Sequence, residues 1–275
     1  MYKQLVPDQQ PFRMRIAVRG KNVQIRLNEE LLVDYVEPTP PVIPAGGEKF
    51  RFLDHGTFAL QCHNDGSRVT YRSVRVRPLP DDLPAYVGPP PVVDETYRRI
   101  INIGRHNLPM VDFHVYLRDG LSLDDALRKS RRDGIQYGIT ADAASLTNKG
   151  SLGDWLAPMK GKPAFFALAT RDRAWTGRMS QEDAKQFDYV IAECDPGQTL
   201  ATIVQRLNQE PIDILSYQAD LPSTDTGQLI EALVRNNVAM ELNTTTQSPN
   251  EQFILQSKAA GCKFAFGTRN ATHQS

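Results

Sequence analysis

The first part of the chain alternates hydrophobic and polar residues, and this pattern predicts an antiparallel sheet. Three runs with a period of two residues lie close together, at residues 12–18, 23–27 and 31–36. Tight turns at residues 20–22 and 28–30 separate these runs. Two further runs, Phe58 to His63 and Arg68 to Arg77, predict another pair of strands. Such alternation is typical of a sheet that buries one of its two faces.

From residue 111 onward the pattern changes to apolar runs separated by amphipathic stretches. The apolar runs, which predict seven strands, lie at residues 111–117, 135–140, 164–169, 189–192, 212–215, 238–242 and 263–266. The stretches between them, which predict helices, lie at residues 123–132, 153–159, 181–187, 199–208, 228–236 and 251–260. Strands that alternate with helices indicate a parallel α/β fold. Seven strands in unbroken alternation favour a closed or nearly closed (β/α)7 barrel over a doubly wound sheet.

A proline-rich segment separates these two patterns. Residues 78–92 read PLPDDLPAYVGPPPV, a composition that predicts an extended linker. A short helix is predicted after it, from Asp94 to Asn107, with Asp94 as the N-cap. We therefore expect a partial antiparallel β-sandwich over residues 1–80, a linker with a short helix over residues 81–107, and the barrel over residues 108–275.

Composition excludes several functional classes. Lys plus Arg and Asp plus Glu number 32 each, so no basic excess exists to bind nucleic acid by neutralising phosphates. No apolar run is long enough to span a membrane, and the N-terminus has no apolar core like that of a signal peptide. The three cysteines lack zinc-site or disulfide-framework spacing. We expect a soluble protein with neither a nucleic-acid partner nor a membrane partner.

The barrel half resembles the polymerase-and-histidinol-phosphatase (PHP) superfamily. Its first strand carries Asp112, His114 and Tyr116 at the spacing of the family's Asp-x-His-x-His motif. A late strand carries Glu241 and Asn243, which match the family's Glu-x-Asn pattern. The resemblance covers residues 108–275 and implies a barrel with a metal-binding mouth.

Several of the family's metal-binding positions hold other residues in this chain. Tyr116 replaces the second histidine, and a phenol binds a divalent metal poorly because it must first lose a proton with a pKa of about 10. Arg269 replaces a carboxylate of the last strand. We therefore expect no bound metal and no cofactor. His114 is then either a remaining metal ligand or a residue of a former site that forms hydrogen bonds inside the mouth.

The N-terminal part resembles the C-terminal portion of the 3-keto-disaccharide hydrolase domain, a concanavalin-like β-sandwich. The run from Gly56 to His63 is its most family-like part. The resemblance implies sugar recognition, with Gln61 and His63 on the sugar-facing surface, and it leaves an extracytoplasmic location open. The strands that should precede Phe12 are absent, so we expect an open apolar face that favours self-association.

Candidate site residues lie at the predicted C-terminal ends of the barrel strands, where α/β barrels place their functional groups. The candidate catalytic residues are Glu241, His114, Glu193 and Asp142. The candidate substrate-binding residues of the barrel are Asp112, Tyr116, Arg171, Asp195, Tyr217, Asn243 and Arg269. Clustered carboxylates there are expected to raise one another's pKa, which suits acid–base work. The Arg269 guanidinium is predicted to take the place of a metal as fixed positive charge and to pair with Glu241 or Glu193.

Together these features predict a hydrolase-like protein of carbohydrate metabolism, with a sugar-recognising sandwich joined to a barrel whose metal site is degenerate. The fusion resembles a class of bacterial sugar-hydrolase-like proteins. The alternative is a non-catalytic binding or scaffold protein that has kept the barrel fold. An active metal-dependent phosphoesterase is disfavoured by the ligand losses. The expected partner is a carbohydrate or another small polar ligand.

Overall fold

The chain divides into two compact units, each with its own sheet. The computed structural model describes residues 6–7, 9–43, 52–60, 66, 68–80, 82–83, 90–104, 110–118, 120–146, 152–171, 181–217, 221, 226–243 and 245–269. One unit comprises Phe12–Asn107, and the other comprises Met1–Pro11 with Leu108–Ser275. The first unit holds a three-stranded antiparallel sheet, and the second holds a seven-stranded parallel sheet.

The small sheet confirms the first three predicted strands. They are β1 (Met14–Arg19), β2 (Asn22–Leu27) and β3 (Glu30–Val36), paired in the order β1-β2-β3. The turn between β2 and β3 places Asn28 and Glu29 at φ values of 48° and 70°. Asn tolerates this left-handed region better than most residues, and its Oδ1 also accepts a hydrogen bond of 2.9 Å from the Arg13 amide.

The prediction of strands at Phe58–His63 and Arg68–Arg77 is wrong for the part of these runs that the structure describes. Residues 58–60 and 68–77 form no strand there. Their apolar side chains are exposed, with Phe58 87% and Val74 63% accessible. A strand persists only where a neighbouring strand takes up its backbone hydrogen bonds, and no described residue of either run pairs with β1, β2 or β3.

The predicted helix after the linker is present as α1 (Glu95–Gly104). Asp94 caps it as expected, because its Oδ1 accepts a hydrogen bond of 2.7 Å from the Tyr97 amide. Residues 105–107, the end of the predicted helix, lie outside the described residues.

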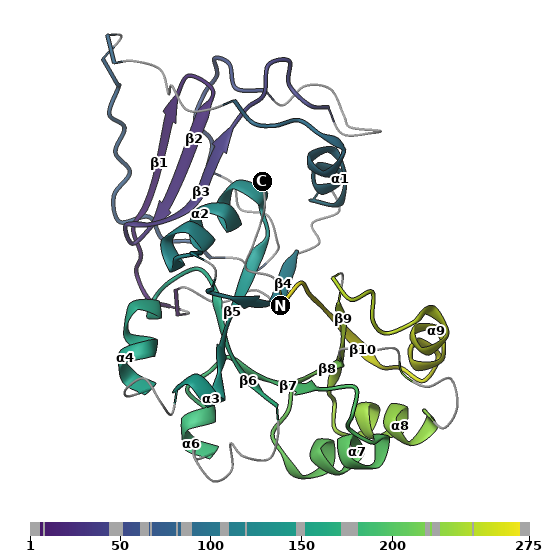
Figure 1. The fold of residues 1–275 in the computed structure, drawn as a ribbon. Coiled ribbons are helices and arrows are strands. Elements are labelled where there is room, and N and C mark those ends of the chain that lie inside the picture. The colour runs from purple at the N-terminus through teal and green to yellow at the C-terminus, as the bar shows by residue number, and fades with distance from the viewer. Residues whose placement is uncertain are drawn as a thin grey trace. The chain divides into compact units, whose positions relative to one another are not determined.

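The second unit is a nearly closed parallel barrel, which confirms the predicted fold class (Figure 1). Its strands follow one another round the ring in chain order: β4 (Val111–Tyr116), β5 (Gln136–Asp142), β6 (Phe165–Thr170), β7 (Tyr189–Cys194), β8 (Ile214–Tyr217), β9 (Ala239–Asn243) and β10 (Lys263–Gly267). Most of their residues are buried. Burial on both faces explains why the sequence shows continuous apolar runs here instead of alternation.

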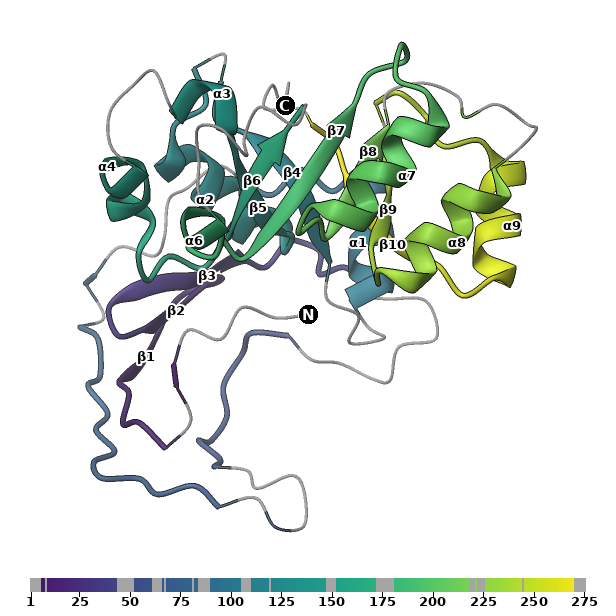
Figure 2. The ribbon, with the colours of Figure 1, turned by 90° about the horizontal axis from the view of Figure 1, so that it is seen from below.

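Helices lie outside the ring of strands (Figures 1 and 2). They are α2 (Leu123–Asp133), α3 (Ala143–Leu146), α4 (Leu152–Leu156), the 3-10 helix η1 (Ala157–Met159), α6 (Gln181–Ala184), α7 (Leu200–Gln209), α8 (Gly227–Arg235) and α9 (Glu251–Ala259). Ser122, Thr199 and Asn250 cap α2, α7 and α9 through their side chains. All six predicted barrel helices are present, and α3 is an addition. No helix in the described ranges has both the length and the apolar character needed to cross a bilayer.

The seam between the first and last barrel strands is joined by side chains as well as backbone. The Arg269 amide donates to the His114 carbonyl at 2.8 Å. Asp112 accepts two bonds from Thr268, one from its amide at 3.1 Å and one from its hydroxyl at 2.7 Å. The Asp112 carboxylate therefore supplies acceptors that a neighbouring strand would otherwise provide.

Two glycines allow close approaches near this seam. A Cβ added at Gly267 would lie 2.6 Å from Glu241 Oε1 and 2.8 Å from the Cβ of His114. A Cβ at Gly138 would lie 1.8 Å from the Tyr189 hydroxyl, which donates to the Phe113 carbonyl at 2.6 Å. These contacts fix the end of β4, and with it the position of His114.

Candidate functional site

His114 lies at the centre of the barrel mouth between two glutamates. Its Nδ1 is 2.8 Å from Glu241 Oε2, and its Nε2 is 3.4 Å from Glu193 Oε1. The three side chains come from β4, β7 and β9, and each is at most 1% exposed. Both nitrogens of the imidazole therefore face carboxylates in a region shielded from solvent.

Two arginines complete the cluster on the side of Glu193. The Arg269 Nη2 donates to Glu193 Oε1 in a short hydrogen bond, and the Arg171 Nε donates to Glu193 Oε2 at 3.0 Å. The Arg269 side chain is 15% exposed and that of Arg171 is 54% exposed. The sequence predicted Glu241 or Glu193 as the partner of Arg269, and in the structure Arg269 pairs with Glu193.

These contacts determine the charge states of the cluster. Burial alone would lower the pKa of His114, but the hydrogen bonds and charges of Glu193 and Glu241 outweigh burial and raise it above its ordinary value. Burial alone would raise the pKa of Glu193, but His114 and Arg269 lower it to about 2. The pKa of Glu241 is likewise lowered, chiefly by His114 against the effect of burial. These shifts favour the charged forms of both carboxylates and of the imidazole between them.

Glu241 is held in place by residues of its own strand and its neighbour. Asn243 Nδ2 donates to Glu241 Oε1 at 2.8 Å, while Asn243 Oδ1 accepts from the amides of Thr245 and Thr246. Ser216 of β8 also lies beside Glu241, and its hydroxyl contributes to lowering the Glu241 pKa. Asn243, a predicted substrate-binding residue, therefore has its amide group engaged in orienting Glu241.

Asp112 and Tyr116 also lie at this mouth. Asp112 is 7% exposed, and burial raises its pKa despite the bonds from Thr268 and the His114 amide. Burial and the nearby Glu193 carboxylate raise the pKa of the Tyr116 phenol well above its ordinary value. The guanidinium of Arg118 lies 5.2 Å from the centre of the Tyr116 ring. Tyr116 therefore remains a neutral phenol.

Other predicted site residues are placed differently. Tyr217 packs in the apolar layer between barrel and helices, because strand alternation turns Ser216 inward in its place. Asp142 accepts a hydrogen bond of 2.9 Å from the Ala144 amide, and Asp195 is exposed. The sandwich candidates Gln61 and His63 lie outside the described residues.

Arg206 is a positioning residue that the sequence reasoning missed. It lies on α7, is 1% exposed, and donates to Thr170 Oγ1 at 3.0 Å and to the Arg171 carbonyl at 3.1 Å. It also pairs with Glu210 at 3.1 Å. Arg206 therefore fixes the end of β6, from which Arg171 reaches the mouth. The available signal was an Arg-Glu pair four residues apart, with the arginine on the apolar side of an amphipathic helix.

The metal that the PHP resemblance implies does not fit these residues. No three His, Cys, Asp or Glu side chains in the described part of the chain converge as a metal-binding group. His114 directs both ring nitrogens at carboxylates, and the Arg269 guanidinium binds the Glu193 oxygen nearest to it. A fixed cation already pairs with Glu193, one of the carboxylates that a metal would need.

Comparisons with known proteins gave one family match and similarity to a solved structure. Residues 2–77 match the family of 3-keto-alpha-glucoside-1,2-lyase-like domains. The crystal structure of histidinol phosphate phosphatase from Lactococcus lactis, complexed with zinc, L-histidinol and phosphate, is similar to the chain with a TM-score of 0.39 and 16% sequence identity. That similarity covers 58% of this chain and 85% of the phosphatase. No curated protein matches the chain.

Proposed function

We propose that this protein recognises a carbohydrate and that its barrel is a non-catalytic folded module. The observation that carries the proposal is the engagement of His114 by both Glu193 and Glu241, with all three side chains at most 1% exposed. A general acid or base must come within hydrogen-bonding reach of a substrate proton. Here His114 lies between the two carboxylates, and all three side chains are shielded from solvent.

The carbohydrate part of the proposal is supported by the N-terminal match. Residues 2–77 match a domain family named for a lyase that acts on 3-keto-alpha-glucosides. The formal net charge of zero gives no electrostatic reason to favour a nucleic-acid ligand. A neutral polar ligand such as a sugar is consistent with both features.

Calorimetric titration with a glucose disaccharide and with its 3-keto derivative tests this proposal, together with chromatography of the same mixtures for cleavage products. Binding of either sugar without cleavage, with or without added zinc or manganese, is the expected result. Cleavage that His114→Asn abolishes and that Arg98→Gln leaves intact would contradict it. Arg98 is a suitable control because it is exposed on α1, in the other unit.

A second candidate function is acid–base cleavage of a sugar at the barrel mouth. The distance of 2.8 Å between His114 Nδ1 and Glu241 Oε2 favours it, because a carboxylate in this position orients an imidazole for proton transfer. If the protein is such an enzyme, Glu241→Gln should lower turnover by roughly a hundredfold or more and leave sugar binding intact. Equal turnover by the unaltered protein and the Glu241→Gln variant would rule out this second function.

A further inference from the structure

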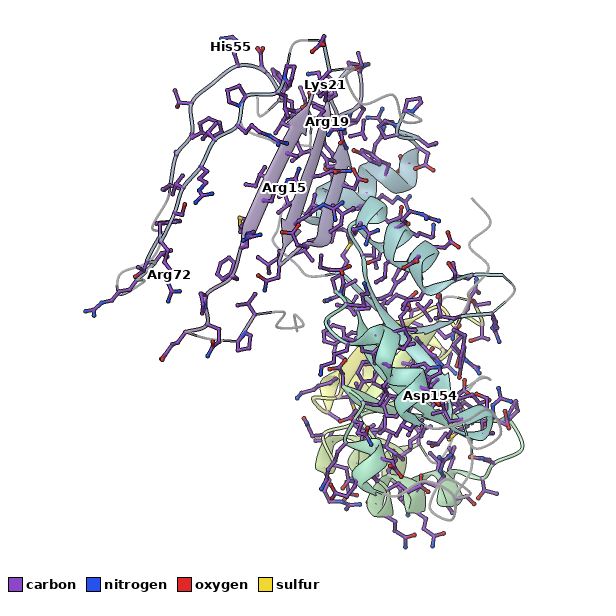
Figure 3. The ribbon with its side chains drawn as sticks, turned by 90° about the vertical axis from the view of Figure 1, so that its left-hand side faces the viewer. Arg15, Arg19, Lys21, His55, Arg72 and Asp154 are labelled. Carbon is purple, nitrogen blue, oxygen red and sulfur yellow. The ribbon has the colours of Figure 1, made fainter. Side chains whose placement is uncertain are left out.

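One face of the β1–β2 ribbon carries a polar hollow of about 230 Å³. Its lining consists of Arg15, Ala17, Arg19, Asn22, Gln24 and Arg26. These residues alternate along the two strands with Met14, Ile16 and Val18 on β1 and with their apolar neighbours on β2, so the hollow lies on the face opposite the apolar one. Figure 3 shows Arg15 and Arg19 on the small sheet.

The arginines of this hollow are arranged in a way that folding alone does not favour. Arg15 lies directly opposite Arg26 in the β1–β2 register, and like charges in this position weaken a strand pair. Within the described residues, the side chains of Arg15 and Arg19 form no hydrogen bond or ion pair. The Arg26 guanidinium donates to a backbone carbonyl, that of Glu29, at 3.1 Å.

One acidic residue of the same sheet, on β3, already accepts a hydrogen bond. Asp34 of β3 lies opposite Gln24, and its Oδ1 accepts a hydrogen bond of 2.8 Å from Asn22 Nδ2. Among the described residues, no carboxylate forms an ion pair with Arg15, Arg19 or Arg26, so their charges can attract an anion from outside.

We propose that this hollow binds an oligosaccharide that carries carboxylate or sulfate groups. A guanidinium group binds either anion through two parallel hydrogen bonds. Arg15 and Arg19 are four residues apart on one strand, a span of about 13 Å, which an extended oligosaccharide with more than one anionic group can bridge. Between them, the Gln24 amide can both donate to and accept from sugar hydroxyls.

The sugar nature of the ligand rests on the proposed function, whereas its negative charge rests on the arginines alone. A compact inorganic anion would engage one end of the hollow and leave the other arginine without a partner. Single-stranded nucleic acid is disfavoured, because such sites use aromatic side chains to stack bases and the hollow is lined by none.

Calorimetric titration of the full chain with dextran, dextran sulfate and polyphosphate tests the inference, since the first two share a backbone and differ in charge. Dextran sulfate is expected to bind more tightly than either of the others. The double variant Arg15→Gln, Arg26→Gln should weaken this binding about tenfold or more, because two charge-assisted contacts are lost. The control variant Arg98→Gln, which removes an exposed arginine outside the hollow, should bind like the unaltered protein.

The outcomes separate this inference from the proposed function. Binding of dextran and dextran sulfate with equal affinity, unaffected by the double variant, overturns the inference and leaves sugar recognition standing. Polyphosphate that binds as tightly as dextran sulfate also overturns it, because the hollow would then select charge without sugar. Absence of binding to all three overturns the inference as well. If dextran sulfate is cleaved and its binding depends on the arginines, the inference is supported. Only the proposal that the barrel is non-catalytic is then contradicted.

Discussion

Removal of the negative charge of Glu193 is expected to destabilise the barrel strongly. The Glu193 carboxylate is 0% exposed and accepts hydrogen bonds from Arg269 and Arg171, while its Oε1 faces His114. The change Glu193→Gln keeps the shape of the side chain and leaves the Arg269 guanidinium, 15% exposed, without its counter-charge. His114 can respond by losing its proton, but the guanidinium cannot.

The free energy of unfolding is expected to fall by about 3 kcal/mol or more, the usual cost of removing one partner of a buried ion pair. Against a total stability of about 5–15 kcal/mol, this loss is large enough to measure in urea. Tryptophan fluorescence reports on the barrel alone, because both tryptophans, Trp155 and Trp175, belong to residues 108–275. The barrel transition should therefore move to a clearly lower urea concentration.

Two companion variants make the result specific. Arg171→Gln removes a partner of the same carboxylate, but its side chain is 54% exposed, so the cost should stay below about 1 kcal/mol. Combining Glu193→Gln with Arg269→Gln removes both charges and should recover part of the loss. A cost for Glu193→Gln no greater than that for Arg171→Gln would refute the view that Glu193 anchors the cluster.

Three further outcomes are expected. Gly267→Ala should lower the free energy of unfolding in urea by about 1–3 kcal/mol, because the new Cβ would displace the carboxylate of Glu241. An unchanged unfolding midpoint would show that the residues around Gly267 can rearrange without cost. The raised pKa of His114 adds stability to the folded barrel that is complete below about pH 6.5 and is lost as pH rises through the pKa of the folded state. The lowered pKa of Glu193 adds stability that is present above about pH 4.5 and is lost as pH falls toward 2. The advantage of the unaltered barrel over His114→Asn should accordingly peak between these limits, and a pH-independent difference would count against the assigned charges. Sedimentation at micromolar concentration should show association through the exposed apolar side chains of the sheet unit, which the double change Ile16→Lys, Phe58→Lys reduces; identical monomers would argue against that surface.

The barrel could be predicted from the sequence because its signal is local. Each strand is an apolar run buried on both faces, and residues 165–170 are buried throughout. The alternating runs at residues 58–63 and 68–77 misled the prediction, because their described residues form no strand. Alternation fixes which side chains could share a face, but a strand also needs a hydrogen-bonded neighbour, and the pattern at residues 68–77 contains no information about one.

The candidate site was predictable in part for a related reason. The ends of barrel strands converge, so His114, Glu193 and Glu241 could be expected to meet. Their exact partners depend on which residue of a strand faces inward, and a one-residue difference exchanges Tyr217 for Ser216. The pairing of Arg206 with Glu210 could be read from their spacing of four residues, but its contacts with the backbone carbonyls of Arg171 and Glu193 could not, because residue types give no signal for them.

Metal content tests the central claim, that an ion-pair cluster occupies the barrel mouth where the PHP resemblance implies a metal. The protein would be dialysed against zinc, manganese or iron, freed of loosely held ions, and measured by elemental analysis beside the variant His114→Asn, Glu241→Gln. We expect far less than one metal ion per chain in both proteins, because His114 and the carboxylates already bind one another and Arg269. A full equivalent of metal in the unaltered protein that the variant loses would contradict the account.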